Sequence, residues 1–372
     1  MVGGGRDAFI GGVHRIASRI DDHFELIAGA FSSTVEKSKL SGLDLGVAED
    51  RSYGSFKEMA IREARLKDGI EAVSIVTPNH LHFSVAKEFL KRGIHVICDK
   101  PLTASASEAK KFLNVVESSN ALFVLTHNYT AYPMIRQARA MIENKELGDI
   151  RVVQVEYAQD WLSTNLEDSN HKQASWRVDP ERSGAGGCIG DIGTHAFNLA
   201  GFVTGLKLES LSADLHTFVE GRQLDDNVHI MMRYEGGAKG MLWSSQVAQG
   251  CENGLRLRVY GSDGAIEWYQ EEPNKLFHAA QGEAKRIITR GGPGANDAAN
   301  AVSRIPAGLP EGYLEGFATL YNETAHAIYA ARDNKSIDTL TPGIKDGYEG
   351  IAFITAAVAS SKKNGNWVKL SR

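Results

Sequence analysis

Two side chains that can exchange a proton lie four residues apart in the second half of the chain. They are Asp191 and His195, within the segment 186–195, which reads GGCIGDIGTH. On a helix this spacing places both on one face, and an imidazole ionises near neutral pH, which suits a general base. A helix cap beside a partly exposed histidine would explain the same pair. A shared metal ion is a third interpretation, which we do not favour because no third ligand of matching type stands nearby in the sequence.

A glycine-rich hexamer near the N-terminus fits a turn that binds a dinucleotide. Residues 3–8 read GGGRDA and match the pattern G-x-G-x-x-A. Such a turn bends tightly at its first glycine, lets a pyrophosphate approach the backbone at the second, and leads into a helix whose N-terminus attracts phosphates. The strand that should precede the motif is reduced to Met1-Val2, so we expect further residues upstream. We expect the cofactor to contact Gly3, Gly5, Ala8, Phe9 and Ile10.

The strand after this motif ends without the carboxylate that usually binds the adenosine ribose. The segment 30–33 reads AFSS and contains no Asp or Glu. Ser32, Ser33 and Lys37 can contact either a ribose hydroxyl or a 2′-phosphate, although Lys37 is equally typical of a solvated loop. We therefore expect NAD or NADP as the cofactor, with a slight preference for NAD.

A lysine stands at the end of another strand-like run. Lys100 lies just beyond the apolar run 95–98, and the carboxyl ends of parallel strands border the ligand crevice of an open α/β sheet. There an ammonium can orient and polarise a substrate oxygen beside the nicotinamide. Pro101 restricts the backbone, with a cis bond as one option. The alternative is a lysine that simply reaches water. We expect Lys100 to meet Asp191 and His195 across a cleft between two domains.

The first third of the chain alternates strand-like runs with amphipathic stretches. The runs 26–31, 72–76, 95–98 and 122–125 have the length of strands. Apolar residues recur at helical spacing between these runs. The positions are Ile10, Val13, Ala17 and Ile20, then Phe83, Ala86 and Leu90, then Ala109, Phe112 and Val116. This alternation predicts an α/β Rossmann domain with a doubly wound parallel sheet over residues 1–126.

The rest of the chain has a different pattern. Apolar residues alternate at period two over 151–157, 229–234, 240–244 and 255–260, and glycines at 236–237 and 264 suit hairpin turns. Helices are predicted from Pro133 to about Gly148 and near 191–204, 311–333 and 346–362, with a long loop over 290–312. We predict an α+β domain with a large, mostly antiparallel open sheet over 127–372. A sheet face left uncovered by helices favours a homo-oligomer.

The composition is that of an ordinary globular protein. The 372 residues are 42% hydrophobic and 23% charged with a net charge of −5, so we expect no nucleic-acid partner. No apolar stretch reaches the roughly 18–20 residues of a membrane helix, and no secretory signal is visible. Cys98, Cys188 and Cys251 are odd in number and widely spaced, which argues against disulfides and structural zinc. We expect a cytoplasmic protein with no membrane partner.

Three further motifs complete the pattern of a known family. The segment 77–82 reads TPNHLH, 98–101 reads CDKP, and 186–195 carries Asp191 and His195. Together with the glycine turn they resemble the Gfo/Idh/MocA oxidoreductase family, which includes glucose–fructose oxidoreductase and inositol dehydrogenase, over nearly the whole chain. The segments 126–129, 159–161 and 176–177 are similar to the branch that contains levoglucosan dehydrogenase. Two positions depart from the family: Asp99 replaces the usual Glu, and Leu309 stands where many relatives carry His before Pro-Glu-Gly.

The resemblance implies an NAD(P)-dependent dehydrogenase that acts on a secondary hydroxyl of a sugar, anhydrosugar or cyclic polyol. It implies that His195 takes the hydroxyl proton as hydride leaves the same carbon, and that Asp191 positions the substrate and tunes Lys100. The implied cofactor contacts are Thr77, Pro78, Asn79, His82, Asp99, Lys100 and Asn128. His80 and His82 fit a loop under a dinucleotide more simply than a metal site. The implied substrate contacts are a stacking wall of Tyr129, Trp161 and Trp176, with hydrogen bonds from Gln159 and Arg177. Each of these five is equally compatible with a core or interface position.

Two other functions fit the same pattern. One is a glycosidase that retains its cofactor, in which hydride leaves and returns within one cycle. The other is a dinucleotide-sensing regulator, because a fold does not determine a function. A sensor needs no proton acceptor, so the presence of Lys100, Asp191 and His195 favours an enzyme. Relatives are commonly dimers or tetramers, and we expect the same here.

Overall fold

Short apolar runs in the first 125 residues form a parallel sheet. The structure is a computed structural model that describes residues 1–169, 172–336 and 338–371. The sheet has the order β1-β2-β3-β4, with Ile75 beside Cys98 and Cys98 beside Leu125 in parallel register. The strands are β1 (Val2–Gly3), β2 (Ala72–Val76), β3 (His95–Cys98) and β4 (Phe123–Leu125). The predicted Rossmann-type domain is confirmed.

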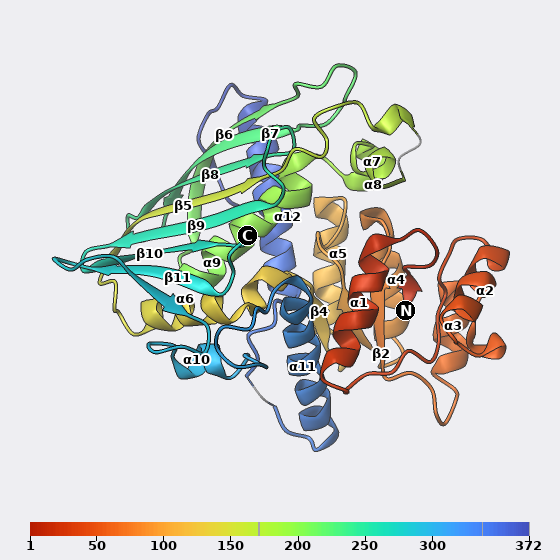
Figure 1. Ribbon diagram of the computed structural model, residues 1–372. Helices are drawn as coiled ribbons and strands as arrows, with labels where there is room; N and C mark the ends of the chain where they lie inside the picture. Colours follow the sequence, from red (N-terminus) through yellow and green to blue (C-terminus); the bar gives the residue numbers. More distant parts are fainter. Residues whose placement is uncertain (170–171, 337, 372) are drawn as a thin grey trace. The chain divides into compact units, whose positions relative to one another are not determined.

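Helices alternate with these strands (Figure 1). They are α1 (Phe9–Ile20), α2 (Val35–Asp44), α3 (Phe56–Glu63), α4 (His82–Leu90), α5 (Ala106–Glu117) and, much later in the chain, α11 (Tyr313–Arg332). Two of them begin at a serine whose hydroxyl accepts a backbone N–H: Ser55 from Glu58 and Ser105 from Glu108. A serine three residues before a glutamate is a capping box, so the sequence encodes these helix starts locally.

Two details of this part differ from the prediction. The run 26–31 is not a strand: only Ala30 pairs with Val2, and Gly29 pairs with Ser52. The physical reason is that β1 offers just two residues to pair with. The buried face of α1 is also shifted, because Ile20 is 36% exposed whereas His14 is fully buried.

Contacts divide the chain into two compact units. Unit 1 comprises Met1–Asn128 and Leu314–Tyr348, and unit 2 comprises Tyr129–Tyr313 and Glu349–Arg372. Residues 314–348, which the division after residue 126 assigns to the second domain, pack with unit 1. Two hydrogen bonds connect this segment to the first 128 residues. The Tyr321 hydroxyl lies 2.7 Å from His14 Nδ1, and the Leu125 N–H donates to the Pro342 carbonyl at 2.9 Å. Helix α12 (Ile344–Ser361) passes from unit 1 into unit 2.

Unit 2 contains a nine-stranded sheet with the order β12-β11-β10-β9-β5-β8-β7-β6-β13. Strand β5 runs parallel to β8, and the other neighbouring pairs are antiparallel. The predicted large, mostly antiparallel sheet is therefore confirmed. The strands are β5 (Ile150–Ala158), β6 (Leu208–His216), β7 (Asn227–Tyr234), β8 (Lys239–Ser245), β9 (Gly254–Gly261), β10 (Gly264–Tyr269), β11 (Lys275–Ala280), β12 (Arg286–Thr289) and β13 (Val368–Lys369).

One face of this sheet is covered and the other is partly open. Helices α6 (Pro133–Glu143) and α9 (Thr194–Thr204) pack against the covered face, and Figure 1 shows them alongside the strands. Strand β7 shows the difference, since Val228 and Ile230 are buried whereas Met231, which points the opposite way, is 59% exposed.

The segments around the predicted site contain short helices. These are α7 (Lys172–Arg177), α8 (Pro180–Ser183) and α10 (Asp297–Asn300). The helix expected near 191–204 is present, but it begins with a single π-turn over Ile189–Gly193, a feature that often marks functional sites. The expected long loop 290–312 contains the one-turn helix α10. The Arg290 guanidinium holds this loop, because it donates to Glu311 and to the Ile305 carbonyl.

Among the described residues, none of the helices combines the length and the hydropathy of a membrane span.

Candidate active site

The glycine-rich turn of unit 1 is packed so tightly that it requires glycine. Gly3 and Gly4 have φ angles of 80° and 71°, which residues with a side chain rarely adopt. A Cβ on Gly3 would lie 2.8 Å from the Val76 carbonyl oxygen, and one on Gly5 would lie 2.6 Å from Ser41 Oγ. A Cβ on Gly11 would lie 2.4 Å from the Gly4 Cα. Gly11, outside the hexamer pattern, is thus the glycine that lets α1 approach the turn.

A pocket of about 380 Å³ lies between this turn and α2. Its lining includes the predicted Gly5, Ala8 and Phe9. Two cations beside it are already paired with carboxylates. The Arg6 guanidinium donates to both oxygens of Asp44, at 2.5 and 2.8 Å, and Lys37 Nζ lies 3.6 Å from Asp7 Oδ2. Of the predicted ribose contacts, Ser33 is exposed and Ser32 is half-buried.

Two predicted cofactor residues carry buried polar atoms that the protein does not satisfy. Thr77 Oγ1 and Asn128 Nδ2 have no hydrogen-bond partner within the described part of the chain. A buried polar atom without a partner costs free energy, so its presence calls for an explanation such as a ligand. Together with the glycine turn, these atoms fit a bound dinucleotide.

Lys100 follows β3 through Asp99, and the Lys100–Pro101 peptide is cis. Asp99 Oδ1 accepts a hydrogen bond from the Thr126 hydroxyl at 2.7 Å and lies 3.1 Å from His14 Nε2. Burial opposes the ionisation of Asp99, but His14 and Thr126 hold its pKa below the ordinary value. The shorter carboxylate in the place of the usual Glu is therefore ionised and anchors the backbone next to Lys100.

His82, a predicted cofactor contact, is fully buried in the structure. Its Nδ1 lies 2.8 Å from the Pro101 carbonyl oxygen and its Nε2 lies 2.9 Å from the Thr77 carbonyl oxygen. Burial lowers the pKa of His82, so the ring is neutral at physiological pH. The ring joins the end of β2 to the segment that carries Lys100, and it acts on the site through these backbone groups.

His127 lies in the electrostatic field of Lys100. Burial, and in addition the positive charge of Lys100, lowers the pKa of His127 to about 3. The ring is therefore neutral over the physiological range and does not compete with Lys100 for a negatively charged or polarised oxygen.

We expect the free energy of unfolding to fall as the pH drops below about 6.5, the ordinary pKa of histidine. Between that value and about 3, the unfolded chain binds a proton on His127 that the folded protein does not bind. The lowered pKa thus contributes stability at neutral pH that acid removes, up to several kcal/mol at full extent. Denaturant titrations from neutral pH to pH 4.5 measure this decline. His127→Gln should show a smaller decline than the unmodified protein, and equal declines would contradict the assignment.

In unit 2, Asp191 is bound by two side chains from other segments. Its Oδ2 accepts hydrogen bonds from Gln246 Nε2 at 2.8 Å and from Arg177 Nε at 3.2 Å. The Arg177 guanidinium lies 4.4 Å from the Trp176 ring centroid and 5.9 Å from the Trp161 ring centroid. Four predicted site residues are therefore brought together here, and the guanidinium expected to bind a sugar bonds to Asp191.

His195 lies among aromatic rings in the same unit. Its ring centroid is 4.9 Å from that of Tyr129 and 6.2 Å from that of Tyr157, and the two tyrosine hydroxyls are 2.6 Å apart. Burial raises the pKa of both phenols, so both remain protonated at neutral pH. Neither phenol is therefore available as a base at neutral pH, and the imidazole is the group of this cluster that can accept a proton.

A chain of amide groups links the tyrosines to the predicted Gln159. Asn253 Oδ1 accepts hydrogen bonds from the Tyr157 hydroxyl at 2.8 Å and from Gln159 Nε2 at 2.9 Å. Gln159 Oε1 in turn accepts from Trp161 Nε1 at 3.0 Å. Tyr129, Gln159, Trp161, Trp176, Arg177, Asp191 and His195 thus all belong to one set of contacts in unit 2.

Three of these site residues, Tyr157, Gln246 and Asn253, are not predicted from the sequence. For Gln246 the signal is its position after a strand, and using it requires the strand pairing that the structure shows. Gln246 follows β8 as Gln159 follows β5, and parallel neighbouring strands end at the same edge of a sheet. The Gln159 N–H accordingly donates to the Ser245 carbonyl at 2.8 Å.

Metal ligation has no visible basis in the described ranges, which contain no group of three or more His, Cys, Asp or Glu side chains placed to hold an ion.

Two family models match this chain. Residues 1–138 match the oxidoreductase family with an NAD-binding Rossmann fold, and residues 135–267 match the GFO/IDH/MocA C-terminal domain. Among curated proteins, the uncharacterized oxidoreductase YfiI of Bacillus subtilis is 38% identical over 99% of this chain and 95% of its own length. Levoglucosan dehydrogenase of Pseudarthrobacter phenanthrenivorans is 29% identical over 80% of each chain.

Solved structures are similar over the whole chain. An oxidoreductase from Sinorhizobium meliloti is 58% identical with a TM-score of 0.91, over 99% of this chain and 98% of that one. An inositol dehydrogenase homolog from Azotobacter vinelandii, complexed with NADH and myo-inositol, is 36% identical with a TM-score of 0.92, over 99% and 96%.

Proposed function

The chain belongs to the Gfo/Idh/MocA family of NAD-binding oxidoreductases, and from this premise we propose that it oxidises a secondary hydroxyl of a cyclic polyol, sugar or anhydrosugar. The observation that carries the proposal is the set of contacts around Asp191 and His195. The Asp191 carboxylate and the His195 imidazole lie there among aromatic rings and amide groups. The polar groups suit the hydroxyls of a ligand, and the aromatic rings suit its C–H groups.

The proposed reaction removes a proton and a hydride from one H–C–O–H group. A bound nicotinamide would supply the hydride acceptor. The His195 imidazole takes the hydroxyl proton, since the neighbouring phenols of Tyr129 and Tyr157 are held in their protonated form. The Lys100 ammonium orients the reacting oxygen and stabilises the negative charge that develops on it. Asp191 accepts a substrate hydroxyl and steadies the positive charge that His195 gains.

Inositol-like polyols are the substrates that we propose to test first. The related protein with bound NADH and myo-inositol supports this choice, and levoglucosan, the substrate named for another relative, is the second. Trp161 and Trp176 supply faces for the C–H side of a ring, and Gln159 supplies an amide for its hydroxyls.

NAD is the cofactor that we propose. Arg6 and Lys37 lie beside the nucleotide turn, but their charges are compensated by Asp44 and Asp7. A 2′-phosphate would gain little from cations that are already paired, whereas Ser32 and Ser33 can bind ribose hydroxyls. The proposed cofactor-binding groups are the glycine turn, Thr77 directly after β2, Pro78 and Asn79 that follow it, and Asn128.

The test is a kinetic panel. Purified protein is mixed with NAD⁺ or NADP⁺ and with inositols, levoglucosan and aldoses, and the absorbance of reduced cofactor is followed. We expect turnover with a cyclic polyol or anhydrosugar, and a higher kcat/KM with NAD⁺ than with NADP⁺. Release of a leaving group without net cofactor reduction would instead indicate the cofactor-retaining glycosidase. Cofactor binding with no turnover of any substrate would indicate the regulator.

We infer that the open face of the unit 2 sheet pairs with a second copy of the chain. Its exposed apolar side chains include Met231 and Met241, which are cross-strand neighbours, and Val152 and Tyr260, which pair on the adjacent strands. Light scattering should report a dimer or tetramer. The double variant Met231→Glu, Met241→Glu places charges on this face and should shift the mass toward the monomer, and an unchanged mass would contradict this interface.

A reducing compartment, the cytoplasm, suits the three cysteines. All are free thiols, and burial raises the pKa of Cys98 and Cys188 well above its ordinary value, so neither is a reactive thiolate. Cell fractionation tests this location.

A further inference from the structure

Asp225 binds the turn that leads to Asp191. Its Oδ1 accepts the Gly187 N–H at 2.7 Å, and its Oδ2 accepts the Ile189 N–H at 2.8 Å. Its backbone carbonyl accepts the Cys188 N–H at 2.8 Å. One residue therefore holds three successive N–H groups at the start of the π-turn.

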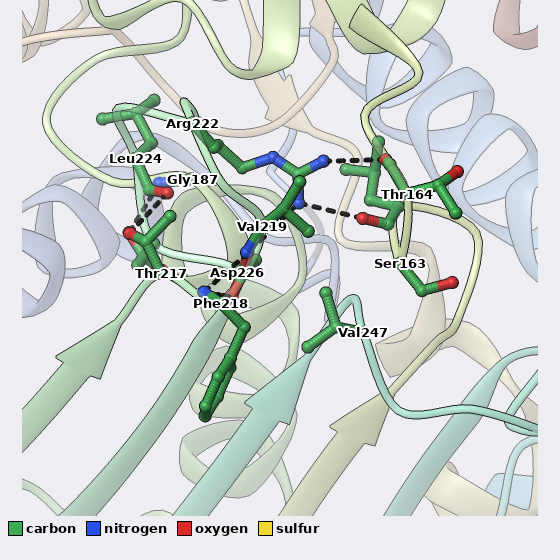
Figure 2. Close-up of polar contacts among 12 residues, drawn as sticks. Ser163, Thr164, Gly187, Thr217, Phe218, Val219, Arg222, Leu224, Asp226 and Val247 are labelled. Atoms are coloured by element: carbon green, nitrogen blue, oxygen red, sulfur yellow. Dashed lines mark hydrogen bonds and ion pairs between the residues drawn. The ribbon is translucent and has the colours of Figure 1, made fainter.

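The contact is so close that it explains a glycine of the 186–195 motif. A Cβ on Gly187 would lie 2.3 Å from the Asp225 carbonyl oxygen and 2.9 Å from the Leu224 Cβ. Figure 2 shows Gly187 next to Leu224. The Gly187 carbonyl then accepts the Asp191 N–H at 2.9 Å. Gly187 therefore links the two residues: its N–H is bound by Asp225, and its carbonyl binds the Asp191 N–H.

A second route connects the same segment to the Asp191 side chain. The Asp226 carbonyl accepts the Gln246 N–H at 2.8 Å, and Gln246 Nε2 donates to Asp191 Oδ2. Asp226 is itself held, because its carboxylate pairs with the buried Arg222 at 3.2 Å. Arg222 also donates to the Leu162 and Thr164 carbonyls, and Figure 2 shows it reaching toward the Ser163–Thr164 segment. The segment that carries Asp225 and Asp226 is therefore tied through Arg222 to residues 162–164.

We propose that Asp225 is a positioning residue whose carboxylate fixes the π-turn and, through it, the Asp191 carboxylate and the His195 ring for proton transfer. The inference rests on the proposed function. It assigns to Asp225 no contact with the substrate, because the residue acts through the backbone N–H groups of Gly187 and Ile189.

The stability of the fold does not by itself explain why residue 225 is an aspartate. Burial, with a smaller contribution from Asp226, raises the pKa of Asp225 to about 6 although the side chain accepts two N–H groups. The raised pKa means that the ionised carboxylate is less favourable in the folded protein than in the unfolded chain, although the ionised form still predominates at neutral pH. An asparagine has the same shape without the charge, but it accepts with one oxygen only. Its NH₂ group would face the second N–H donor and push the turn away.

The variant Asp225→Asn separates the two roles. We expect kcat for the polyol to fall roughly 10- to 100-fold, since small misplacements of reacting groups have effects of this size. KM should stay within about threefold of the unmodified protein, because Asp191 supplies only one of the proposed substrate contacts and those of Gln159, Trp161 and Trp176 lie outside the π-turn. The midpoint of thermal unfolding should stay close to that of the unmodified protein, because the loss of the buried charge offsets the loss of one N–H contact. The control is Asp214→Asn, an exposed carboxylate on β6 of the same unit, which should change neither quantity.

Two results would overturn the assignment. One is a kcat for Asp225→Asn within about twofold of the unmodified protein. The other is a loss of activity that is accompanied by a lower midpoint of thermal unfolding, because Asp225 would then merely support the fold. Gly187→Ala provides a second variant, since its methyl group displaces the turn while the carboxylate remains. It should show the same loss of kcat.

A crystal structure of Asp225→Asn gives a readout that does not depend on activity. We expect the π-turn to shift and the hydrogen bond between Gln246 and Asp191 to be broken. An unmoved Asp191 would overturn the inference whether or not the enzyme turns over a polyol. Absence of turnover by the unmodified protein would refute the proposed function alone, and the structure would still decide the role of Asp225.

Discussion

We expect the replacement of Lys100 by alanine to lower kcat/KM for the polyol by about 10²- to 10³-fold, the usual effect of removing one group that stabilises developing charge on oxygen. Lys100 lies two residues beyond the end of β3, and contacts of its two chain neighbours fix the backbone on either side of it. Asp99 is anchored by His14 and Thr126, and the Pro101 carbonyl lies against His82. Lys100→Arg should not restore the rate, because a guanidinium is larger and planar and cannot place its charge where the compact ammonium does.

Three measurements identify the cause of this loss. NAD⁺ binding to Lys100→Ala should stay near that of the unmodified protein, and the exposed Lys110→Ala should retain full activity. The pKa of His127, followed by NMR, should rise in Lys100→Ala because part of its depression comes from the Lys100 charge. Full activity of Lys100→Ala would remove Lys100 from the mechanism.

We expect the replacement of His195 by alanine to lower kcat by about 10²- to 10⁴-fold, the range typical of a lost general base. The phenols beside it cannot take over, because burial keeps Tyr129 and Tyr157 protonated at neutral pH. Water or hydroxide must then accept the proton, so the residual rate should rise steadily with pH. The pH profile of kcat and the rescue of activity by added imidazole both measure this change.

The control for His195 is His326→Ala, which changes an exposed imidazole on α11 and should leave kcat unaltered. Thermal unfolding should show that His195→Ala is folded. A variant that keeps its rate, or that loses it with no change in pH dependence, would exclude His195 as the proton acceptor.

Most of the fold could be predicted because its signals are local. The runs 72–76 and 95–98 are short and apolar, and they form β2 and β3 of the parallel sheet. Glycines at 236 and 237 have positive φ angles, as expected for the hairpin between β7 and β8. The run 26–31 has the same apolar character and does not form a strand, because pairing depends on a partner that local sequence does not describe.

The residues with chemistry of their own could be found in the same way. An ammonium, a carboxylate, an imidazole and a glycine turn each need a specific residue type, so Lys100, Asp191, His195 and Gly3 stand out in the sequence. Amide and hydroxyl side chains carry no such mark. Their roles come from the partners that they meet, and sequence alone therefore did not reveal Gln246 or Asn253.

The residue types and their local periodicity are written in the chain, and they suffice for the two kinds of sheet, the dinucleotide turn and the reacting groups. Folding alone brings distant segments into register. Asp191 meets Gln246 from 55 residues away and Gly187 meets the Asp225 carboxylate from 38 residues away. Such contacts depend on which strands pair, above all on the parallel pairing of β5 with β8, and on long-range burial that no short stretch of sequence encodes.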